Sequence, residues 1–414
     1  MSYQGYGQPY GQPPPPQGYG QYPPSHGHYP PQQGGYYDRP PPPPPGQHPP
    51  QQSPYGHHPP PQQYGHHSPA PPPPVQYGAP QMQHYGPPVT QTPPSLGYGA
   101  PPFIRWDPQP DADALRSAMK GFGTDEKALI RILSTKDPLQ IDLVRRCFDS
   151  SLKRDLIKDL KSETSGWFEK GLLQLARGPL LADVHNLHEA MSGPGTKEVV
   201  LNDILLGRSN ADLTSIKGAY QETFHKNLID VVKGELSMKT ERHFLMVLSA
   251  NRADDAAPVI PQQVEDDVTA LYKATESRMG TDELIVCDIL THRNDNQIRA
   301  IAHRYQQRFN YDLEKVIKSE FSGHMEDALL YQLRHAVDMF MHAATLLEES
   351  MAGMGTKDHL LVSRVVRYHW NPHTLANVKG AYQQRYGKSL SSRINGETSG
   401  DYRRLMLACV GEQF

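Results

Sequence analysis

Cysteine is scarce in this chain of 414 residues, which contains only Cys147, Cys287 and Cys409. They lie far apart in apolar runs, so we expect buried, reduced thiols and no disulfide framework. No apolar run reaches the roughly 18 residues that a membrane-spanning helix requires. The N-terminus lacks the basic and apolar regions of a signal peptide. These absences favour a soluble cytoplasmic protein.

Strong charge and catalytic motifs are absent as well. The formal net charge is −3 at pH 7, so the overall charge does not indicate a nucleic-acid partner. The sequence contains no P-loop, no dinucleotide-binding glycine pattern, no Cys/His zinc spacing and no nucleophile elbow. We therefore predict that the protein is not an enzyme and does not bind nucleic acid.

The first quarter of the chain has almost no aliphatic side chains. Residues 1–102 hold most of the 41 prolines and more than half of the 22 tyrosines, and their only full charges are Asp38 and Arg39. Such a segment cannot bury enough apolar surface to offset the entropy lost on ordering, so we predict a disordered tail over 1–105. Arg39, Pro42 and Pro45 match the polyproline motif of SH3-type ligands, a match that a proline run also produces by chance. A flexible, self-associating or partner-binding segment is the simpler interpretation.

Glycine, in contrast, recurs in a fixed pattern. Four related turns occur along the chain: Gly121-Phe122-Gly123-Thr124, Gly193-Pro194-Gly195-Thr196, Arg278-Met279-Gly280-Thr281 and Gly353-Met354-Gly355-Thr356. Each is followed by a glutamate, respectively Glu163, Glu235, Glu320 and Glu397. The glutamate comes 40 residues after the glycine that precedes the turn threonine in the first three units and 42 residues after it in the fourth. Self-similarity at a nearly fixed period indicates a repeat architecture.

Each unit reads as a set of helices, so the predicted fold class is all-α. A short amphipathic helix over 112–120 runs into the first turn, and the turn threonine is expected to cap a second helix. Three of the four glutamates are expected to open a further helix in a Glu-x-Ser-Gly turn. The segment 253–263, with Pro258 and Pro261, is predicted to link two pairs of repeats.

These motifs resemble those of one family. The run from Met119 to Asp125, with Asp155-Leu156 and Glu163 behind it, resembles an annexin repeat, and four such units follow in series over 107–414. The leader is similar to those of long-tailed annexins. The resemblance implies four repeats of five helices in a curved disc, at 106–178, 179–251, 262–336 and 338–413.

The resemblance also implies Ca²⁺-dependent binding of acidic phospholipid membranes through loops on the convex face, with the chain on membranes peripherally when Ca²⁺ rises. The implied ligands are backbone carbonyls and one carboxylate per loop: Met119, Gly121, Gly123 and Glu163; Met191, Gly193, Gly195 and Glu235; Thr275, Arg278, Gly280 and Glu320; Met351, Gly353, Gly355 and Glu397. The protein departs from the family at Thr275, where glycine is common. It also departs in the fourth repeat, where two residues inserted around 368–372 place Asn395 at the usual spacing; we assign Glu397 by its Thr-Ser-Gly context.

The ligand sets that the resemblance implies have the composition that a hard cation such as Ca²⁺ prefers, carbonyl oxygens plus a carboxylate. Three carbonyls and a bidentate carboxylate supply about five of the 6–8 oxygens that Ca²⁺ takes, which leaves room for water or a lipid phosphate. The turn tips Phe122, Pro194, Met279 and Met354 either pack inward or contact lipid. The alternative is a Ca²⁺-independent helical repeat scaffold that binds proteins, with the tail as an interaction segment.

Overall fold

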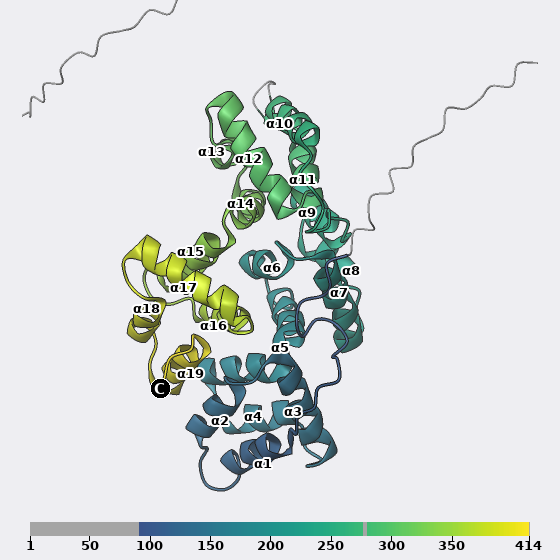
Figure 1. Cartoon of the computed structure of the whole chain (residues 1–414). Helices are drawn as coiled ribbons and strands as arrows, with labels where there is room; N and C mark the ends of the chain where they lie inside the picture. The colour runs from purple at the N-terminus through teal and green to yellow at the C-terminus, as the bar shows by residue number, and fades with distance from the viewer. Residues whose placement is uncertain (1–90, 276–279, 414) are drawn as a thin grey trace, which may run out of the picture. The chain divides into compact units, whose positions relative to one another are not determined.

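The computed structural model describes residues 91–275 and 280–413, and every regular element in this part of the chain is an α-helix (Figure 1). The first repeat contains α1 (Gln109–Ala118), α2 (Glu126–Leu133), α3 (Pro138–Ser150) and α4 (Leu156–Glu163), and α5 (Gly166–Ala190) leads into the second. The second continues with α6 (Glu198–Leu205), α7 (Asn210–Phe224), α8 (Leu228–Glu235) and α9 (Met238–Leu248). The third contains α10 (Pro261–Thr275), α11 (Glu283–His292), α12 (Asp295–Phe309), α13 (Leu313–Glu320) and α14 (Gly323–Val337). The fourth contains α15 (Met339–Met351), α16 (Asp358–His369), α17 (Pro372–Tyr386), α18 (Leu390–Glu397) and α19 (Gly400–Cys409). The all-α prediction is confirmed.

Helix α5 belongs to two repeats. Gly178 interrupts it with a φ of 72°, a conformation that glycine adopts without a steric penalty, and Pro179 follows. Its first half therefore serves as the last helix of repeat 1 and its second half as the first helix of repeat 2. Counted in this way, each repeat has five helical segments, as predicted.

Side-chain N-caps set the internal spacing of the repeats. A polar residue caps the third helical segment of each repeat, and another caps the fourth: Asp137 and Asp155, Ser209 and Asn227, Asn294 and Asp312, Asn371 and Ser389. Each of these side chains accepts a hydrogen bond from a backbone N–H of the first helical turn, which stabilises that helix start. The two caps lie 18 residues apart in every repeat. The glutamate of each turn-glutamate pair follows the second cap by eight residues, so its place is fixed by the caps.

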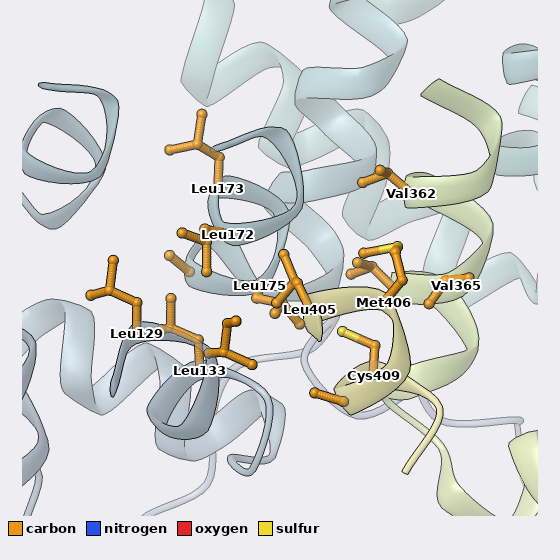
Figure 2. Close-up of a cluster of buried hydrophobic side chains, with 14 of the residues drawn as sticks. Leu129, Leu133, Leu172, Leu173, Leu175, Val362, Val365, Leu405, Met406 and Cys409 are labelled. Atoms are coloured by element: carbon orange, nitrogen blue, oxygen red, sulfur yellow. The ribbon is translucent and has the colours of Figure 1, made fainter. Parts of the chain in front are cut away.

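The first and last repeats share one hydrophobic core. Figure 2 shows Leu129 and Leu133 of α2 and Leu172 of α5 packing beside Leu405 and Cys409 of α19. The α5–α19 contact is close, because a Cβ added to Gly171 would lie 2.6 Å from Leu405 Cδ2. A second core is built mainly from repeat 2 with side chains of α14, α15 and α16, and a third from repeat 3. Repeats 1 and 4 therefore depend on each other for burial.

Ion pairs with a buried carboxylate also join separate helices. Arg364 of α16 donates to both carboxylate oxygens of Asp203 of α6, at 2.7 and 3.2 Å, and both side chains are less than a tenth exposed. Arg293 donates to both oxygens of Asp267 within repeat 3, at 2.7 and 2.9 Å. Because a buried charge without a partner is costly, each pair constrains the two helices it joins.

The segment before α1 contacts the repeats, although the predicted tail extends to residue 105. The Thr92 N–H and hydroxyl donate to Asp254 at 2.7 and 3.0 Å, and those of Ser95 donate to Asp212, both at 2.7 Å. Tyr98 is buried and donates its hydroxyl to Asp183 at 2.6 Å. The packed part of the chain thus begins before residue 105. The polyproline match at residues 39–45 lies outside the described residues.

Three further features bear on the sequence predictions. The linker predicted at 253–263 lies mostly between α9 and α10, and α10 begins at Pro261. Cys147, Cys287 and Cys409 are buried free thiols, as expected, and burial raises the pKa of Cys287 and Cys409 to about 12. In the described part of the chain, no helix is long and apolar enough to cross a lipid bilayer.

Candidate cation loops

A backbone hydrogen bond closes each Gly-rich turn at its base. The N–H of Asp125 donates to the carbonyl of Ala118 at 2.9 Å, and the same contact recurs from Lys197 to Ala190 at 3.0 Å. The remaining two contacts run from Asp282 to Ala274 and from Lys357 to Ser350, both at 2.8 Å. The third loop is one residue longer than the others between its closing residues. The same backbone hydrogen bond therefore closes all four turns, across one more residue in the third.

Left-handed backbone conformations shape the turns. Gly121 and Gly123 have φ values of 116° and 85° in the first loop, and Gly353 and Gly355 have values of 100° and 88° in the fourth. Gly195 and Gly280 also have positive φ, whereas Gly193 does not. A Cβ added at any of these glycines would meet no atom within 4 Å. Except at Gly193, glycine is thus favoured by the backbone conformation and not by close packing.

Each turn threonine contacts its glutamate and does not cap the following helix. Thr196 donates its hydroxyl to Glu235 Oε2 at 2.6 Å, and Thr281 makes the same bond to Glu320. The contact is 3.4 Å from Thr124 to Glu163 and 2.9 Å from Thr356 to Glu397. The predicted threonine cap is wrong, because the second helix begins one residue later; in repeat 1, Asp125 occupies the cap and accepts from the N–H of Ala128. The threonine instead positions the carboxylate beside the turn.

The glutamates end helices, and the prediction that they open the next helix is also wrong. They are the last residues of α4, α8, α13 and α18, each a helix of 8 residues. In repeat 4 the contact of Thr356 is made with Glu397, while Asn395 is exposed. The N-cap of the third helix follows its turn glycine by 14 residues in repeats 1 to 3 and by 16 in repeat 4, from Gly355 to Asn371, so the two extra residues lie before Asn371. An insertion at that place leaves the end of α18 beside the turn.

The third loop is described only in part. Arg278 and Met279 lie outside the described residues. Thr275 is buried at the end of α10, and its hydroxyl donates to the carbonyl of Leu271 at 3.0 Å. Thr275, Gly280 and Glu320 therefore make up the described part of this candidate site.

The turn tips that the structure describes point into solvent. Phe122 and Met354 are fully exposed, and Pro194 is exposed as well. Lys120 is exposed beside Phe122. The inward-packing interpretation is therefore wrong for these tips. In contrast, the side chains of Met119, Met191 and Met351 at the loop bases are buried and anchor the loops to the cores.

The fourth loop differs from the others because an arginine reaches into it. Arg393 lies one turn before Glu397 on α18, and it donates to the Glu397 carboxylate and to the carbonyl of Met351. Burial lowers the pKa of Arg393, but Glu348 and Glu397 more than offset this and raise it above its ordinary value. Among the described residues, no ion pair joins a cation to the other three loop glutamates. The sequence interpretation did not single out Arg393, although a basic residue at this position in only one repeat was a visible signal.

The donor set of the first three loops suits a hard cation. The described residues contain no cluster of three or more His, Cys, Asp or Glu side chains that could hold a metal. A cation site at these turns must therefore combine one carboxylate with backbone carbonyls, which are oxygen ligands of the kind that Ca²⁺ prefers. Beside Glu163, a surface hollow of about 380 Å³ is lined by Glu126, Trp167 and Asp401. The first loop thus has open space next to its carboxylate.

Four five-helix repeats, each pairing a glycine turn with a helix-ending glutamate, define a class of helical repeat protein. A family model described as Annexin matches the chain at residues 110–175, 182–247, 266–331 and 341–409. The chain belongs to the annexin family.

Individual relatives agree with this assignment. Annexin C1 of Cryptococcus neoformans var. grubii is 42% identical over 309 residues, which cover 74% of this chain and 65% of the relative, so the match spans less than two thirds of that protein. The solved structure of annexin III matches with a TM-score of 0.72 and 31% identity, over 78% of this chain and 98% of that one. A calcium-bound annexin (Sm)1 structure matches with a TM-score of 0.65 and 30% identity, over 74% and 91% of the two chains.

Proposed function

We propose that this protein binds acidic phospholipid membranes reversibly when Ca²⁺ is present, and that the Gly-turn loops with their glutamates hold the ions. The observation that carries the proposal is the fourfold placement of a helix-ending carboxylate beside a glycine turn, bridged by the turn threonine. The family membership and the calcium-bound relative support it. On the arrangement that the family implies, the loops share the convex face of a curved disc.

The carbonyls of residues 119, 121 and 123 with Glu163 would hold the ion in the first loop, and those of residues 191, 193 and 195 with Glu235 in the second. In the third loop, the carbonyls of Thr275, Arg278 and Gly280 would join Glu320. The carbonyls of Met351, Gly353 and Gly355 with Glu397 form the corresponding set in the fourth loop. There, Arg393 already donates hydrogen bonds to two of these groups, Glu397 and the carbonyl of Met351. Each set provides one formal negative charge for a divalent ion, so intrinsic affinity should be weak.

Because the loops alone bind Ca²⁺ weakly, the membrane supplies part of the coordination. Ca²⁺ takes 6–8 oxygens, so a lipid phosphate can complete the coordination that the loop leaves incomplete. Lipid then raises the affinity for Ca²⁺, and by thermodynamic linkage Ca²⁺ raises the affinity for lipid by the same factor. Attachment therefore follows the Ca²⁺ concentration, and it reverses when the ion is removed.

The exposed tips provide a second contact with the bilayer. Phe122 and Met354 extend from the turns into solvent, where large apolar side chains gain free energy by entering the boundary between headgroups and acyl chains. Lys120 beside Phe122 adds attraction to anionic headgroups. The ion and the tip thus act on the same patch of membrane.

Co-sedimentation with phosphatidylserine vesicles tests the proposal. The chain should pellet with vesicles in Ca²⁺ and return to the supernatant when chelator is added. Glu163→Gln, Glu235→Gln and Glu320→Gln combined should abolish most of the Ca²⁺-dependent pelleting, because glutamine can still accept the threonine hydrogen bond but removes the charge. Glu222→Gln, at an exposed position on α7, is the matched control and should behave as the unmodified chain does.

Two results would contradict the proposal. Equal pelleting in Ca²⁺ and in excess chelator would mean that the loops do not control attachment. A chain that pellets with vesicles neither in Ca²⁺ nor in excess chelator would favour the alternative. In that case the protein is a Ca²⁺-independent scaffold that binds proteins through its helices and through the Pro-rich segment.

A further inference from the structure

Arg393 makes three contacts with groups that belong to the fourth loop or adjoin it. Its guanidinium donates to Glu397 through Nη1 and to the carbonyl of Met351 through Nη2. Its Nε donates to both carboxylate oxygens of Glu348, at 3.2 and 3.3 Å. The side chain is 18% exposed, so most of it lies within the protein. Two of these acceptors, the Glu397 carboxylate and the Met351 carbonyl, are the oxygens assigned above to the fourth cation.

The corresponding position carries no cation in the other repeats. It lies four residues before the loop glutamate and is occupied by Asp159, Val231 and Val316. Asp159 is paired with Arg154 at 2.6 Å and with Arg116 of α1 at 3.8 Å. Arg116 and Arg154 therefore form ion pairs with Asp159 and not with Glu163.

An exchange of charge between two helices accounts for the difference. In repeat 1 the first helix carries Arg116 and the fourth carries Asp159. In repeat 4 the equivalent positions are reversed, with Glu348 on α15 and Arg393 on α18. Glu348 also accepts a hydrogen bond from Tyr382, so it remains partnered on both sides. The reversal places the positive charge on the helix that ends in the loop glutamate, one turn away from its carboxylate.

We propose that the Arg393 guanidinium takes the place of the Ca²⁺ ion in the fourth loop, so that this loop binds no Ca²⁺ at concentrations that load the other three. The proposal rests on the proposed function, because it assigns a different state to one of the same four loops. A divalent ion at this loop would meet a fixed positive charge, and it would have to displace the hydrogen bonds to Glu397 and Met351. The guanidinium joins the loop to α18, as an ion bound by the same oxygens would.

Single glutamate variants of the full chain test the proposal directly. Ca²⁺ bound per chain is measured by equilibrium dialysis with phosphatidylserine vesicles. Glu235→Gln should lower the number by about one ion, since it removes the charged ligand of one loop. Glu397→Gln should leave the number unchanged. A loss of about one ion in Glu397→Gln would overturn the proposal and leave the proposed function standing.

Removal of the arginine provides the converse test. In the background Glu163→Gln, Glu235→Gln and Glu320→Gln, only the fourth loop keeps its carboxylate, and we expect almost no bound Ca²⁺. Adding Arg393→Met should restore about one ion per chain, because a neutral side chain of similar length frees the carboxylate and the carbonyl. Arg146→Met, which removes an exposed arginine on α3, is the matched control and should restore none.

The outcomes separate the two proposals. Restoration by Arg393→Met but not by Arg146→Met supports the inference. The inference is overturned if Arg393→Met, added to the triple-glutamine background, gives a folded protein that binds no Ca²⁺. It is also overturned if that background binds one Ca²⁺ ion while Arg393 is still present. An unmodified chain that binds no Ca²⁺ even with vesicles overturns the proposed function itself. Circular dichroism establishes that each variant is folded, and the Glu397→Gln result does not depend on the Arg393 variant.

Discussion

Carboxylates serve two different purposes in the loops and in the interior. Asp203 accepts two hydrogen bonds from Arg364, and Asp267 accepts two from Arg293. The carboxylate of Glu235 accepts only from Thr196 among the described residues. An interior carboxylate with its charge matched holds helices together, whereas a loop carboxylate with its charge unmatched remains available to an ion. On the proposed function, ion binding in the first three loops therefore depends on a carboxylate whose charge is left unpaired.

Breaking an interior pair should have the largest effect on stability. Asp203→Ala leaves Arg364 charged, buried and without its carboxylate, so we expect the free energy of unfolding to fall by about 3–5 kcal/mol. Denaturant unfolding measures the change. Asp142→Ala, which removes a partner of the exposed Arg146, should cost about 1 kcal/mol or less. Equal losses in the two variants would contradict the distinction between interior and surface pairs.

Acid should destabilise the protein through histidines that the interior keeps neutral. Burial lowers the pKa of His243 to about 4, with His324 nearby adding to the effect, while the unfolded chain titrates near 6.5. Below pH 6.5 the unfolded state therefore binds a proton that the folded state does not. The stability that the neutral His243 provides is complete above pH 6.5 and is lost as the pH falls from 6.5 towards 4, by about 2 kcal/mol at pH 5.

Denaturant unfolding at pH 7 and pH 5 measures this dependence. His243→Leu should reduce the difference between the two pH values, because it removes the group that titrates differently in the two states. The exposed His303 offers the control, and His303→Leu should retain most of the difference. An unchanged difference in His243→Leu would contradict the assignment.

Neutralising a loop carboxylate should change ion binding and leave the fold intact. For Glu235→Gln we expect the Ca²⁺ affinity of that loop to fall at least about tenfold, because the remaining ligands are neutral. Without Ca²⁺ the free energy of unfolding should change little, since no cation in the described part of the chain pairs with this glutamate. Thermal unfolding with and without Ca²⁺ separates the two effects, because only a bound ion stabilises the folded state by mass action. A large loss in the Ca²⁺-free protein would mean that this carboxylate is structural.

The smallest change is expected where a carboxylate keeps one of two partners. Tyr98→Phe removes a hydrogen bond to Asp183, but Asp183 still pairs with Arg208, so we expect a loss of roughly 1 kcal/mol. Thermal or denaturant unfolding measures it, and Ca²⁺-dependent vesicle binding should be unchanged. A chain beginning at Phe103 lacks this anchor and one beginning at Gln91 keeps it, so the first should unfold at lower denaturant concentration.

The sequence predicted the helical repeats well because local chemistry determines them. The glycine turns and the helical spacing of apolar residues are each read from a few neighbouring residues and predict an all-α fold, and the structure confirms the four sets of five helical segments that the resemblance to annexin repeats implied. The threonine prediction failed because Thr124 had two possible partners, the backbone N–H groups of α2 and Glu163, which lies 39 residues away. Local patterns do not decide between a near partner and one brought close by folding.

The other gaps also concern contacts across the fold. Sequence context was enough to choose Glu397 over Asn395, but the Arg393 contact depends on the packing of α15 against α18. Tyr98 lies in a segment of tail-like composition, and nothing nearby in the sequence indicates its bond to Asp183. Single-residue contacts between distant elements therefore needed the structure, whereas the spacing of the elements did not.

The core shared by repeats 1 and 4 also constrains how the chain is made. Ribosomes synthesise proteins from the N-terminus, and domains generally fold as units once their sequence has emerged. Leu129 and Leu172 emerge early, but the α19 side chains that cover them follow only after residue 400. A nascent chain that ends before α19 should therefore leave this apolar surface uncovered, so the core shared by repeats 1 and 4 can be completed only after the last helix has been made.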